Sequence, residues 1–265
     1  MNSAHVEITS AQNARVKEWA GLLEKKHRDR RGRFLIEGVH LVQEAVAMQA
    51  EIECIVYDSE RGVPHELQDI LQLEAVEWIA AAPHVIAKCT ETDTPPPVFA
   101  VVAKPKPSLE ALYKERALVV VLDSVRDPGN VGTIIRSADA VGADGVILGK
   151  GCVDLYNPKT VRSTMGSIFH LPIMEADLLT LLPEAKQRGI RLTGTSLQTD
   201  HSCYDYDWTA ASWLVMGSES QGLSPQIKAL MDETVLIPMR GRAESLNVAM
   251  ATTVLLYEAL RQRIK

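Results

Sequence analysis

Three short polar segments, each following an apolar run, carry the residues best suited to binding a ligand. The first, "DPGNVGTIIRSAD", contains Arg136; the second, "MGSESQGLS", contains Glu219; the third is "IPMRGRAESLNVAM", residues 237–250. In α/β sheets, ligands bind beyond the carboxyl ends of the strands, which is where such segments would lie. Their glycines would allow the backbone to approach a ligand closely.

Arg136 has two interpretations. A helix beginning near Asn130 would carry one apolar stripe, and Arg136 would lie off that stripe on the same face as Gly132. Gly132 would leave space above the guanidinium for a ligand. Alternatively, Arg136 is a surface residue paired with Asp139, three positions later. The residues alone leave both interpretations open.

The other two segments also permit plain structural readings. The G-x-E-x-x-G pattern around Glu219 could be a tight turn that places a carboxylate near a helix N-terminus. Ser245 is predicted to be the N-cap of the last helix. That helix has no charge between Glu244 and Glu258, so we expect the core to cover one face and a second subunit another.

Strands alternating with helices must position these segments. Such alternation predicts a mostly parallel sheet covered on both sides. The predicted strands of the second half are residues 117–123, 145–149, 190–196, 212–217 and 233–239. The predicted helices there are residues 130–141, 179–189, 223–231 and 245–263.

A smaller α/β unit precedes this half. Its predicted helices are residues 11–28 and 40–49, and its predicted strands are 33–38, 52–58, 75–80 and 96–103. The sequence "KPKPS" then reads as a linker. We therefore expect an N-terminal domain over residues 1–104, a linker over 105–116 and a C-terminal domain over 117–265.

Positive charge is concentrated near the N-terminus of an acidic chain. The whole chain has 28 Lys and Arg against 34 Asp and Glu, a net charge of −6. Residues 15–33, in contrast, hold eight basic and three acidic side chains. This segment is either a solvated helix face or a phosphate-binding patch. The candidate RNA-binding residues are Lys25, Lys26, Arg28, Arg30, Arg31 and Arg33.

Several classes of protein are disfavoured. The four cysteines have no C-x-x-C pair and the histidines no metal-ligand spacing, so we expect no metal and a reducing, cytoplasmic location. No apolar run approaches the ~20 residues of a membrane span. The glycines of residues 142–151 do not follow the dinucleotide-binding pattern, and P-loop, H-E-x-x-H and G-x-S-x-G motifs are missing from the sequence.

The three segments, in this order, resemble the three motifs of the SpoU (TrmH-like) family of SPOUT RNA methyltransferases. The matching sequences are "DPGNVGTIIRSADAVGADGVIL", "MGSESQGLS" and "IPMRGRAESLNVAMATTVLLYE". The N-terminal part resembles the substrate-binding domain often fused in front, which is similar to small ribosomal proteins that bind kinked RNA.

The resemblance implies methylation of a ribose 2′-hydroxyl with S-adenosylmethionine as cofactor. Large-subunit rRNA is the expected substrate, with tRNA second. The resemblance also implies a deep trefoil knot in the C-terminal part and a homodimer with the active site near the subunit interface. The residues implied at the cofactor are Thr195, Ser196, Gly217, Ile237 and Leu246.

The catalytic residues implied by the resemblance are Arg136, Asn130, Glu219, Ser245 and Asn247. Arg136 would act at the target ribose as a general base or as an anchor for phosphate and developing alkoxide, and the sequence does not separate these roles. A guanidinium scarcely deprotonates in proteins, so the anchor is physically easier.

Two positions depart from the family pattern. Arg242 stands where many relatives have a small residue, and it is either an RNA contact, which we favour, or simply a loop arginine. Ala249 stands where Ser is frequent. The alternatives to an RNA methyltransferase are a non-catalytic RNA-binding protein with a degenerate methyltransferase domain, and an enzyme acting on a small molecule.

Overall fold

The computed structural model describes residues 6–72 and 76–264. They form two compact units, each described by itself below. One unit comprises the described residues up to Lys106 together with Tyr156–Phe169, and the other comprises Pro107–Leu155 and His170 onwards. Within the described residues, every helix is too short or too polar to cross a lipid bilayer.

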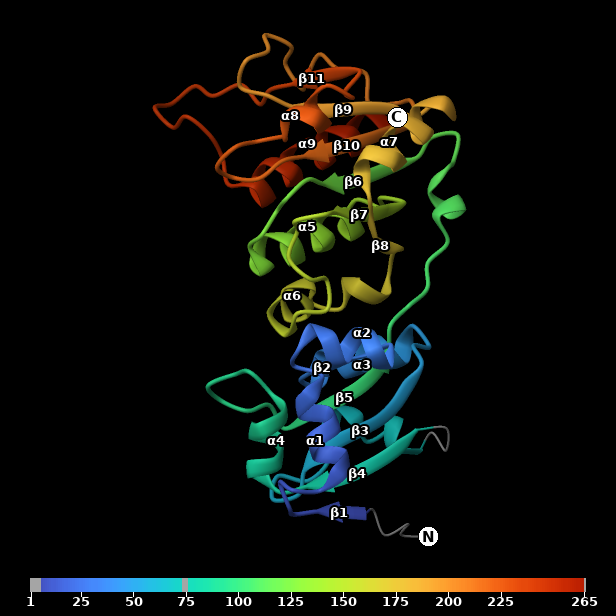
Figure 1. The fold of residues 1–265 in the computed structure, drawn as a ribbon, viewed down its shortest axis with the longest axis vertical. Helices are drawn as coiled ribbons and strands as arrows, with labels where there is room; N and C mark the ends of the chain where they lie inside the picture. Colours follow the sequence, from blue (N-terminus) through green and yellow to red (C-terminus); the bar gives the residue numbers. More distant parts are fainter. Residues whose placement is uncertain (1–5, 73–75, 265) are drawn as a thin grey trace. The chain divides into compact units, whose positions relative to one another are not determined.

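The first unit is built on a mixed five-stranded sheet of order β1-β4-β3-β5-β2 (Figure 1). Strands β1, β4 and β3 are parallel, whereas β5 runs antiparallel to both β3 and β2. The elements of this unit, in chain order, are β1 (Val6–Ile8), α1 (Ala14–Gly21), α2 (Lys25–Arg31), β2 (Arg33–Glu37), α3 (Val39–Ala47), β3 (Ile52–Asp58), η1 (His65–Leu67), η2 (Ile70–Gln72), β4 (Glu77–Ala81), α4 (Pro83–Cys89), β5 (Val98–Ala103), α6 (Pro158–Thr164) and η4 (Ser167–Phe169).

The predicted helix over residues 11–28 is wrong, because the chain breaks into α1 and α2. Arg28 explains the break: it is 2% exposed, and its Nη1 donates to the carbonyls of Leu22 (2.7 Å) and Leu23 (2.8 Å). A helix end leaves carbonyls without intrahelical partners, and the guanidinium supplies donors to them. Ala75, the first residue of the predicted strand 75–80, lies outside the described residues.

Residues 156–169 pack in the first unit although they follow strands of the second. Arg162 forms a 2.7 Å ion pair with the buried Glu37, and the Tyr156 ring lies 4.7 Å from that of Phe34. Nothing in the local sequence pattern indicated these contacts.

The second unit is built on a six-stranded sheet of order β11-β9-β10-β6-β7-β8 in which every pairing is parallel. The sequence-based prediction of a mostly parallel sheet is therefore confirmed. The elements of this unit are η3 (Leu109–Leu112), β6 (Leu118–Leu122), α5 (Pro128–Ala140), β7 (Gly145–Gly149), β8 (Ile173–Ala176), α7 (Leu178–Gln187), β9 (Arg191–Thr195), β10 (Ser212–Met216), α8 (Pro225–Lys228), β11 (Glu233–Val235) and α9 (Val248–Arg263).

Helices cover both faces of this sheet. One face packs α7 and α8 against strand residues such as Val119, Val121 and Val215. Successive strand residues alternate between faces, so Val120 and Leu214, also fully buried, point the other way. On that second face α5 and α9 pack against each other, and their N-terminal ends meet at the carboxyl edge of the sheet (Figure 1).

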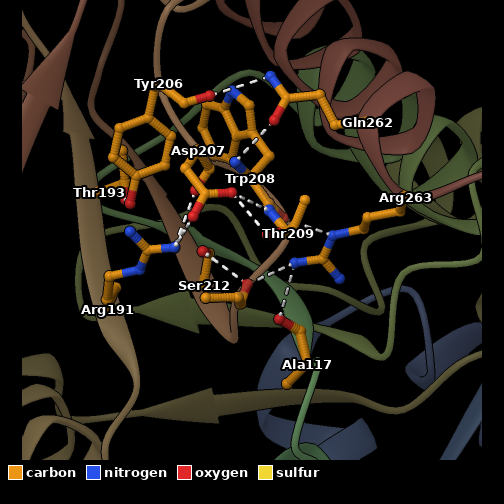
Figure 2. Close-up of polar contacts among 11 residues, drawn as sticks. Ala117, Arg191, Thr193, Tyr206, Asp207, Trp208, Thr209, Ser212, Gln262 and Arg263 are labelled. Carbon is orange, nitrogen blue, oxygen red and sulfur yellow. Dashed lines mark hydrogen bonds and ion pairs between the residues drawn. The ribbon is translucent and has the colours of Figure 1, made fainter. Parts of the chain in front are cut away.

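The C-terminal end of α9 is fastened to the opposite, amino edge (Figure 2). The guanidinium of Arg263 donates to the carbonyls of Trp208 (2.7 Å) and Ala210 (2.8 Å), and also to those of Arg116 and Ala117. Gln262 accepts from the Trp208 backbone N–H at 3.0 Å. Burial lowers the pKa of Arg263, which nevertheless stays protonated.

Two predicted boundaries near the third segment are wrong. The strand predicted over residues 233–239 ends at Val235, and the last helix begins at Val248 instead of Ser245. Residues 236–247 therefore form a longer connection than expected. It leaves the sheet edge and returns to the start of α9, and its residues supply part of the cavity described next.

Candidate active site

The three polar segments meet through one chain of hydrogen bonds. Asn247 Nδ2 donates to Asn130 Oδ1 at 3.0 Å, and Asn130 Nδ2 in turn donates to Glu219 Oε1. These residues are 117 and 89 positions apart in sequence, so only the fold brings them together. The chain links the start of α9, the start of α5 and the loop after β10.

Asn247 also fixes the start of α9. Its Oδ1 accepts hydrogen bonds from the backbone N–H groups of Ala249 (2.9 Å) and Met250 (3.3 Å), which makes Asn247 the N-cap. The prediction that Ser245 is the N-cap is wrong by two residues. The side chain of Asn247 therefore has two functions, because its oxygen caps the helix while its nitrogen holds Asn130.

The start of α5 is fixed in a similar way. Asp127 is its N-cap, with Oδ1 accepting from the Asn130 backbone N–H at 2.8 Å. Asp123, at the end of β6, is 5% exposed and accepts from the backbone N–H of Ser224 at 2.7 Å, which joins two of the loops. Asp123 was not predicted from the sequence; its position directly after an apolar strand was the available signal.

A cavity of about 530 Å³ lies beside these loops. It is lined by residues 195–198, 216–223, 228, 235–237, 239, 244–246, 248 and 251. The residues predicted to bind the cofactor all lie on this wall: Thr195, Ser196, Gly217, Ile237 and Leu246. Glu219 and Ser245 line it as well, whereas Asn130, Arg136 and Asn247 do not.

Glycine is required in the loop after β10. A Cβ on Gly217 would lie 2.0 Å from the carbonyl carbon of Gly222, far inside van der Waals contact. The close approach follows from two backbone hydrogen bonds between Ser218 and Gly222, of 3.0 and 2.9 Å. Gly222 itself has φ 66°, a left-handed conformation that favours glycine. This turn shapes one wall of the cavity.

Several polar residues on the cavity wall were not singled out from the sequence, among them Gln198, Lys228 and Glu244. Gln198 follows β9 and accepts a 3.0 Å hydrogen bond from Lys228, at the end of α8. Glu244 is exposed and lies on the wall contributed by the third segment. The position of Gln198 just past a strand end was a usable signal, whereas the place of Lys228 on the cavity wall depends on tertiary packing.

Arg136 is exposed on α5 and makes no hydrogen bond or ion pair with the described residues. The alternative that it pairs with Asp139 is wrong, because Asp139 Oδ2 lies 2.7 Å from His170 Nδ1 instead. Arg136 follows Asn130 by six residues, so the two side chains leave the helix about 120° apart. Within one chain, Arg136 therefore points away from the Asn130–Glu219 contact.

Half of the candidate RNA-binding residues near the N-terminus are paired with acidic residues, some of them distant in sequence. Arg28 is buried and serves as a structural cap, so we withdraw it from the candidate RNA-binding residues. The ion pairs of the other members are Lys26 with Glu24 (2.9 Å), Arg31 with Glu18 (2.6 Å), and Arg33 with Glu51 (2.8 Å) and Glu53 (3.2 Å). Arg30 Nη2 lies 3.2 Å from His27 Nδ1.

Burial disfavours the thiolate form of the cysteines. All four are free, and burial raises the pKa of Cys54 and Cys89 to about 12 and that of Cys203 to about 11. Among residues 6–72 and 76–264, no group of three or more His, Cys, Asp or Glu side chains could hold a metal ion.

Two family models match the chain. The model of the "SpoU rRNA Methylase family" matches residues 117–257, and that of the "MRM3-like substrate binding domain" matches residues 13–100. The first contains the hydrogen-bonded residues and the cavity, and the second contains the basic segment.

Similar proteins cover nearly the whole chain. The 23S rRNA (guanosine(2553)-2′-O)-methyltransferase RlmP of Bacillus subtilis is 37% identical over 95% of this chain and 98% of its own. The 23S rRNA (uridine(2479)-2′-O)-methyltransferase of Streptomyces viridochromogenes is 40% identical over 97% of this chain and 92% of its own.

A solved structure agrees with these matches. The SpoU methyltransferase AviRb from Streptomyces viridochromogenes, in complex with the cofactor AdoMet, superposes with a TM-score of 0.89 at 39% identity. The superposition covers 96% of this chain and 99% of that one.

Proposed function

Because the chain belongs to the SpoU rRNA methylase family, we propose that it transfers a methyl group from S-adenosylmethionine to a ribose 2′-hydroxyl of large-subunit rRNA. The observation that carries this proposal is the Asn247–Asn130–Glu219 chain, which joins all three motif segments beside a cavity. A decayed, non-catalytic domain would have no need of this arrangement. The alternative substrate is tRNA.

The cavity fits the cofactor. Its volume of about 530 Å³ lies within the range of roughly 300–1,000 Å³ usual for small-molecule sites. Met216, Ile237 and Leu246 offer apolar wall to an adenine ring, and Thr195 and Ser196 offer hydroxyl groups to a ribose. Glu244 adds a carboxylate suited to the cationic groups of S-adenosylmethionine. When bound, S-adenosylmethionine supplies the methyl carbon that the ribose oxygen attacks.

Glu219 is placed to accept a hydrogen bond from a hydroxyl group. Its Oε1 accepts from Asn130, which leaves Oε2 without a hydrogen bond to the described residues. Oε2 can therefore accept from a substrate hydroxyl at the cavity wall. Asn130, held in turn by Asn247, keeps the carboxylate in this orientation and excludes other rotamers.

Arg136 acts as an anchor for phosphate and for the alkoxide that develops on the ribose oxygen. A guanidinium stays protonated in proteins, and the described residues offer no acceptor that would take its proton. Its exposed position on α5 leaves all its donors available to RNA. Ser245, exposed on the cavity wall, binds ribose or cofactor.

A homodimer would bring Arg136 to a cavity. In one chain Arg136 points away from the Asn130–Glu219 contact, so a single subunit leaves the site incomplete. Helix α9 exposes apolar side chains beside α5, with Met250 57% and Tyr257 50% exposed. A second copy packed on this face would cover them and supply its own Arg136. This supports an active site shared between subunits.

A mixing experiment tests the catalytic assignment and the dimer together. Arg136→Ala and Asn130→Ala should each abolish methyl transfer. Arg136→Ala should keep its affinity for S-adenosylmethionine within about twofold of wild type. Co-expressing the two variants should restore about a quarter of wild-type activity, because half of randomly formed dimers would hold one intact site. Full activity of Arg136→Ala alone would refute its role, and no recovery on mixing would refute the shared site.

The substrate itself needs a separate experiment. Mapping 2′-O-methylation across rRNA and tRNA, in cells with and without this protein, should reveal one missing methyl group in large-subunit rRNA. A missing methyl group in tRNA would support the alternative substrate, and an unchanged map in both RNAs would contradict the proposed activity.

Two finer features of the family also belong to this proposal. The last strands and α9 form a deep trefoil knot; the support is the motif match over residues 117–257 and the position of β9 between β10 and β11 in the sheet. A cytoplasmic location is proposed because the similar proteins are named for ribosomal RNA and the cysteines are free.

A further inference from the structure

The lysines and arginines of the second unit fall into two groups, those with a hydrogen-bond or ion-pair partner and those without one among the described residues. At the amino edge of the sheet, lysines and arginines are held by acidic side chains or carbonyl groups. These are Lys114 with Asp144 (2.7 Å), Lys186 with Asp232 (2.7 Å), Arg188 with Glu110 (2.8 Å), Arg191 with Asp207 (3.3 Å), and Arg263 with its carbonyls. Such pairing leaves little positive charge available to another molecule.

The carboxyl edge shows the opposite pattern. Exposed cations there make no hydrogen bond or ion pair through their side chains within residues 107–155 and 170–264: Arg126 before α5, Lys150 after β7, and Arg240 and Arg242 between β11 and α9. Arg136, about two thirds of the way along α5, is also exposed and unpaired among the described residues. At the amino edge, Arg116 alone among the described cations is exposed and unpaired.

The connection that carries Arg240 and Arg242 also has unpaired backbone groups. Residues 237–246 make no backbone–backbone hydrogen bond with the described residues, and every residue from 240 to 247 is exposed. Met239 and Glu244 of the same connection line the cavity, so each arginine stands within two residues of its wall. Unpaired backbone N–H groups and two guanidinium groups are all hydrogen-bond donors, so together they favour binding of an anion from solvent.

We propose that Arg240 and Arg242, on the connection between β11 and α9, bind phosphates of the RNA backbone next to the target nucleotide, with Arg126 and Lys150 extending the contact. This inference rests on the proposed function. Guanidinium groups bind phosphate oxygens in a bidentate fork, which fixes the position of the strand and carries no base specificity.

RNA fits this surface better than a second small ligand. Two acidic residues near the edge are engaged, since Asp127 caps α5 and one carboxylate oxygen of Glu219 accepts from Asn130, whereas Glu244 is exposed on the cavity wall. Arg240 and Arg242 are exposed and stand within two residues of the cavity wall, so a polyanion that approaches from solvent can contact them. Three of the six candidate residues of the basic segment are paired with carboxylates, so the carboxyl edge offers a second source of positive charge.

Salt-dependent binding tests the inference. Each lost phosphate contact should flatten the slope of log K against log salt by about 0.7–0.9, which corresponds to roughly a fivefold weaker affinity at 0.1 M salt. Arg240→Gln/Arg242→Gln should therefore weaken binding of a large-subunit rRNA transcript roughly 25-fold. Arg116→Gln removes one positive charge at the amino edge and should leave the slope unchanged. It is compared with Arg242→Gln, which removes one positive charge at the carboxyl edge.

The double variant should raise the KM for RNA and leave kcat at saturating RNA and the Kd for S-adenosylmethionine within about twofold of wild type. An unchanged salt slope would overturn the inference. Loss of S-adenosylmethionine binding with an unchanged slope would also overturn it and assign the loop to the cofactor. If the wild-type protein itself neither binds the transcript nor methylates it, the proposed function fails instead.

Discussion

The two hydrogen-bonding functions of Asn247 can be separated by substitution. Its Oδ1 caps α9, and its Nδ2 holds Asn130, which holds Glu219. Asn247→Ala removes both functions. Asn247→Asp keeps an oxygen for the Ala249 and Met250 N–H groups, and Asp is as good an N-cap as Asn. It removes the donor, however, so the two variants should agree in catalysis and differ in stability.

The magnitudes follow from these contacts. Loss of the cap costs about 1 kcal/mol, so Asn247→Ala should lower the Tm by about 2–4 °C, whereas Asn247→Asp should stay within about 1 °C of wild type. With Asp at 247, Asn130 lies between two carboxylates. A carboxylate only accepts hydrogen bonds, and only the nitrogen end of the Asn130 amide can donate one. The contact made by the oxygen end must therefore be lost. A hydrogen bond to a charged group contributes about 1.5–3 kcal/mol, which predicts roughly a 10- to 150-fold loss of kcat/KM.

Thermal unfolding and methyl transfer at saturating S-adenosylmethionine provide the two measurements. Asp177→Ala is a matched control, since it removes the N-cap of α7, whose Oδ1 accepts from Leu179 at 3.0 Å, outside the cavity wall. It should lower the Tm and leave kcat/KM unchanged. Wild-type activity in Asn247→Asp would refute the positioning of Glu219 through Asn130. Equal destabilisation by Ala and Asp would refute the capping argument.

Two further substitutions test how the fold supports the site. Gly217→Ala places a Cβ 2.0 Å from the Gly222 carbonyl carbon, so it should cost about 1–3 kcal/mol and weaken S-adenosylmethionine binding in a calorimetric titration; wild-type affinity would contradict the close-approach argument. Arg263→Met removes the donor to the Trp208 and Ala210 carbonyls and should cost about 2–4 kcal/mol in urea unfolding. An unchanged midpoint would show that this anchor contributes nothing.

The basic segment shows how charge counted along the chain differs from charge available in space. Residues 15–33 hold an excess of cations, yet Arg33 meets Glu51 and Glu53, and Arg15 meets Glu77 at 2.7 Å. Salt bridges between exposed side chains contribute little to stability, but they reduce the charge offered to RNA. In the second unit, unpaired Arg240 and Arg242 occur where the sequence shows no basic cluster.

The sequence predicted most elements of the second unit well. Apolar runs such as residues 117–123 predicted buried parallel strands, because a strand covered on both faces needs apolar side chains at every position. The predictions failed at boundaries and at short elements. Strands β1 and β8, with three and four residues, and helices α4 and α6, with seven each, have too little periodicity to be recognised.

The candidate site was accessible from the sequence for a different reason. Asn130, Glu219 and Asn247 stand in motifs whose residue types match a family, so they were identified without knowledge of any contact. Their mutual hydrogen bonds were not predictable, because they join residues 89 and 117 positions apart. Likewise, only the structure showed that Asn247, two residues past Ser245, is the cap.

The sequence by itself determined most strands and helices of the second unit, the family and the candidate site residues, because these depend on local periodicity and on residue identity. The tertiary structure decided which charges are free and where each side chain points. It buried Arg28, paired Arg31 with Glu18, and turned Arg136 away from the Asn130–Glu219 contact. These outcomes depend on contacts between distant parts of the chain, and no local pattern contains them.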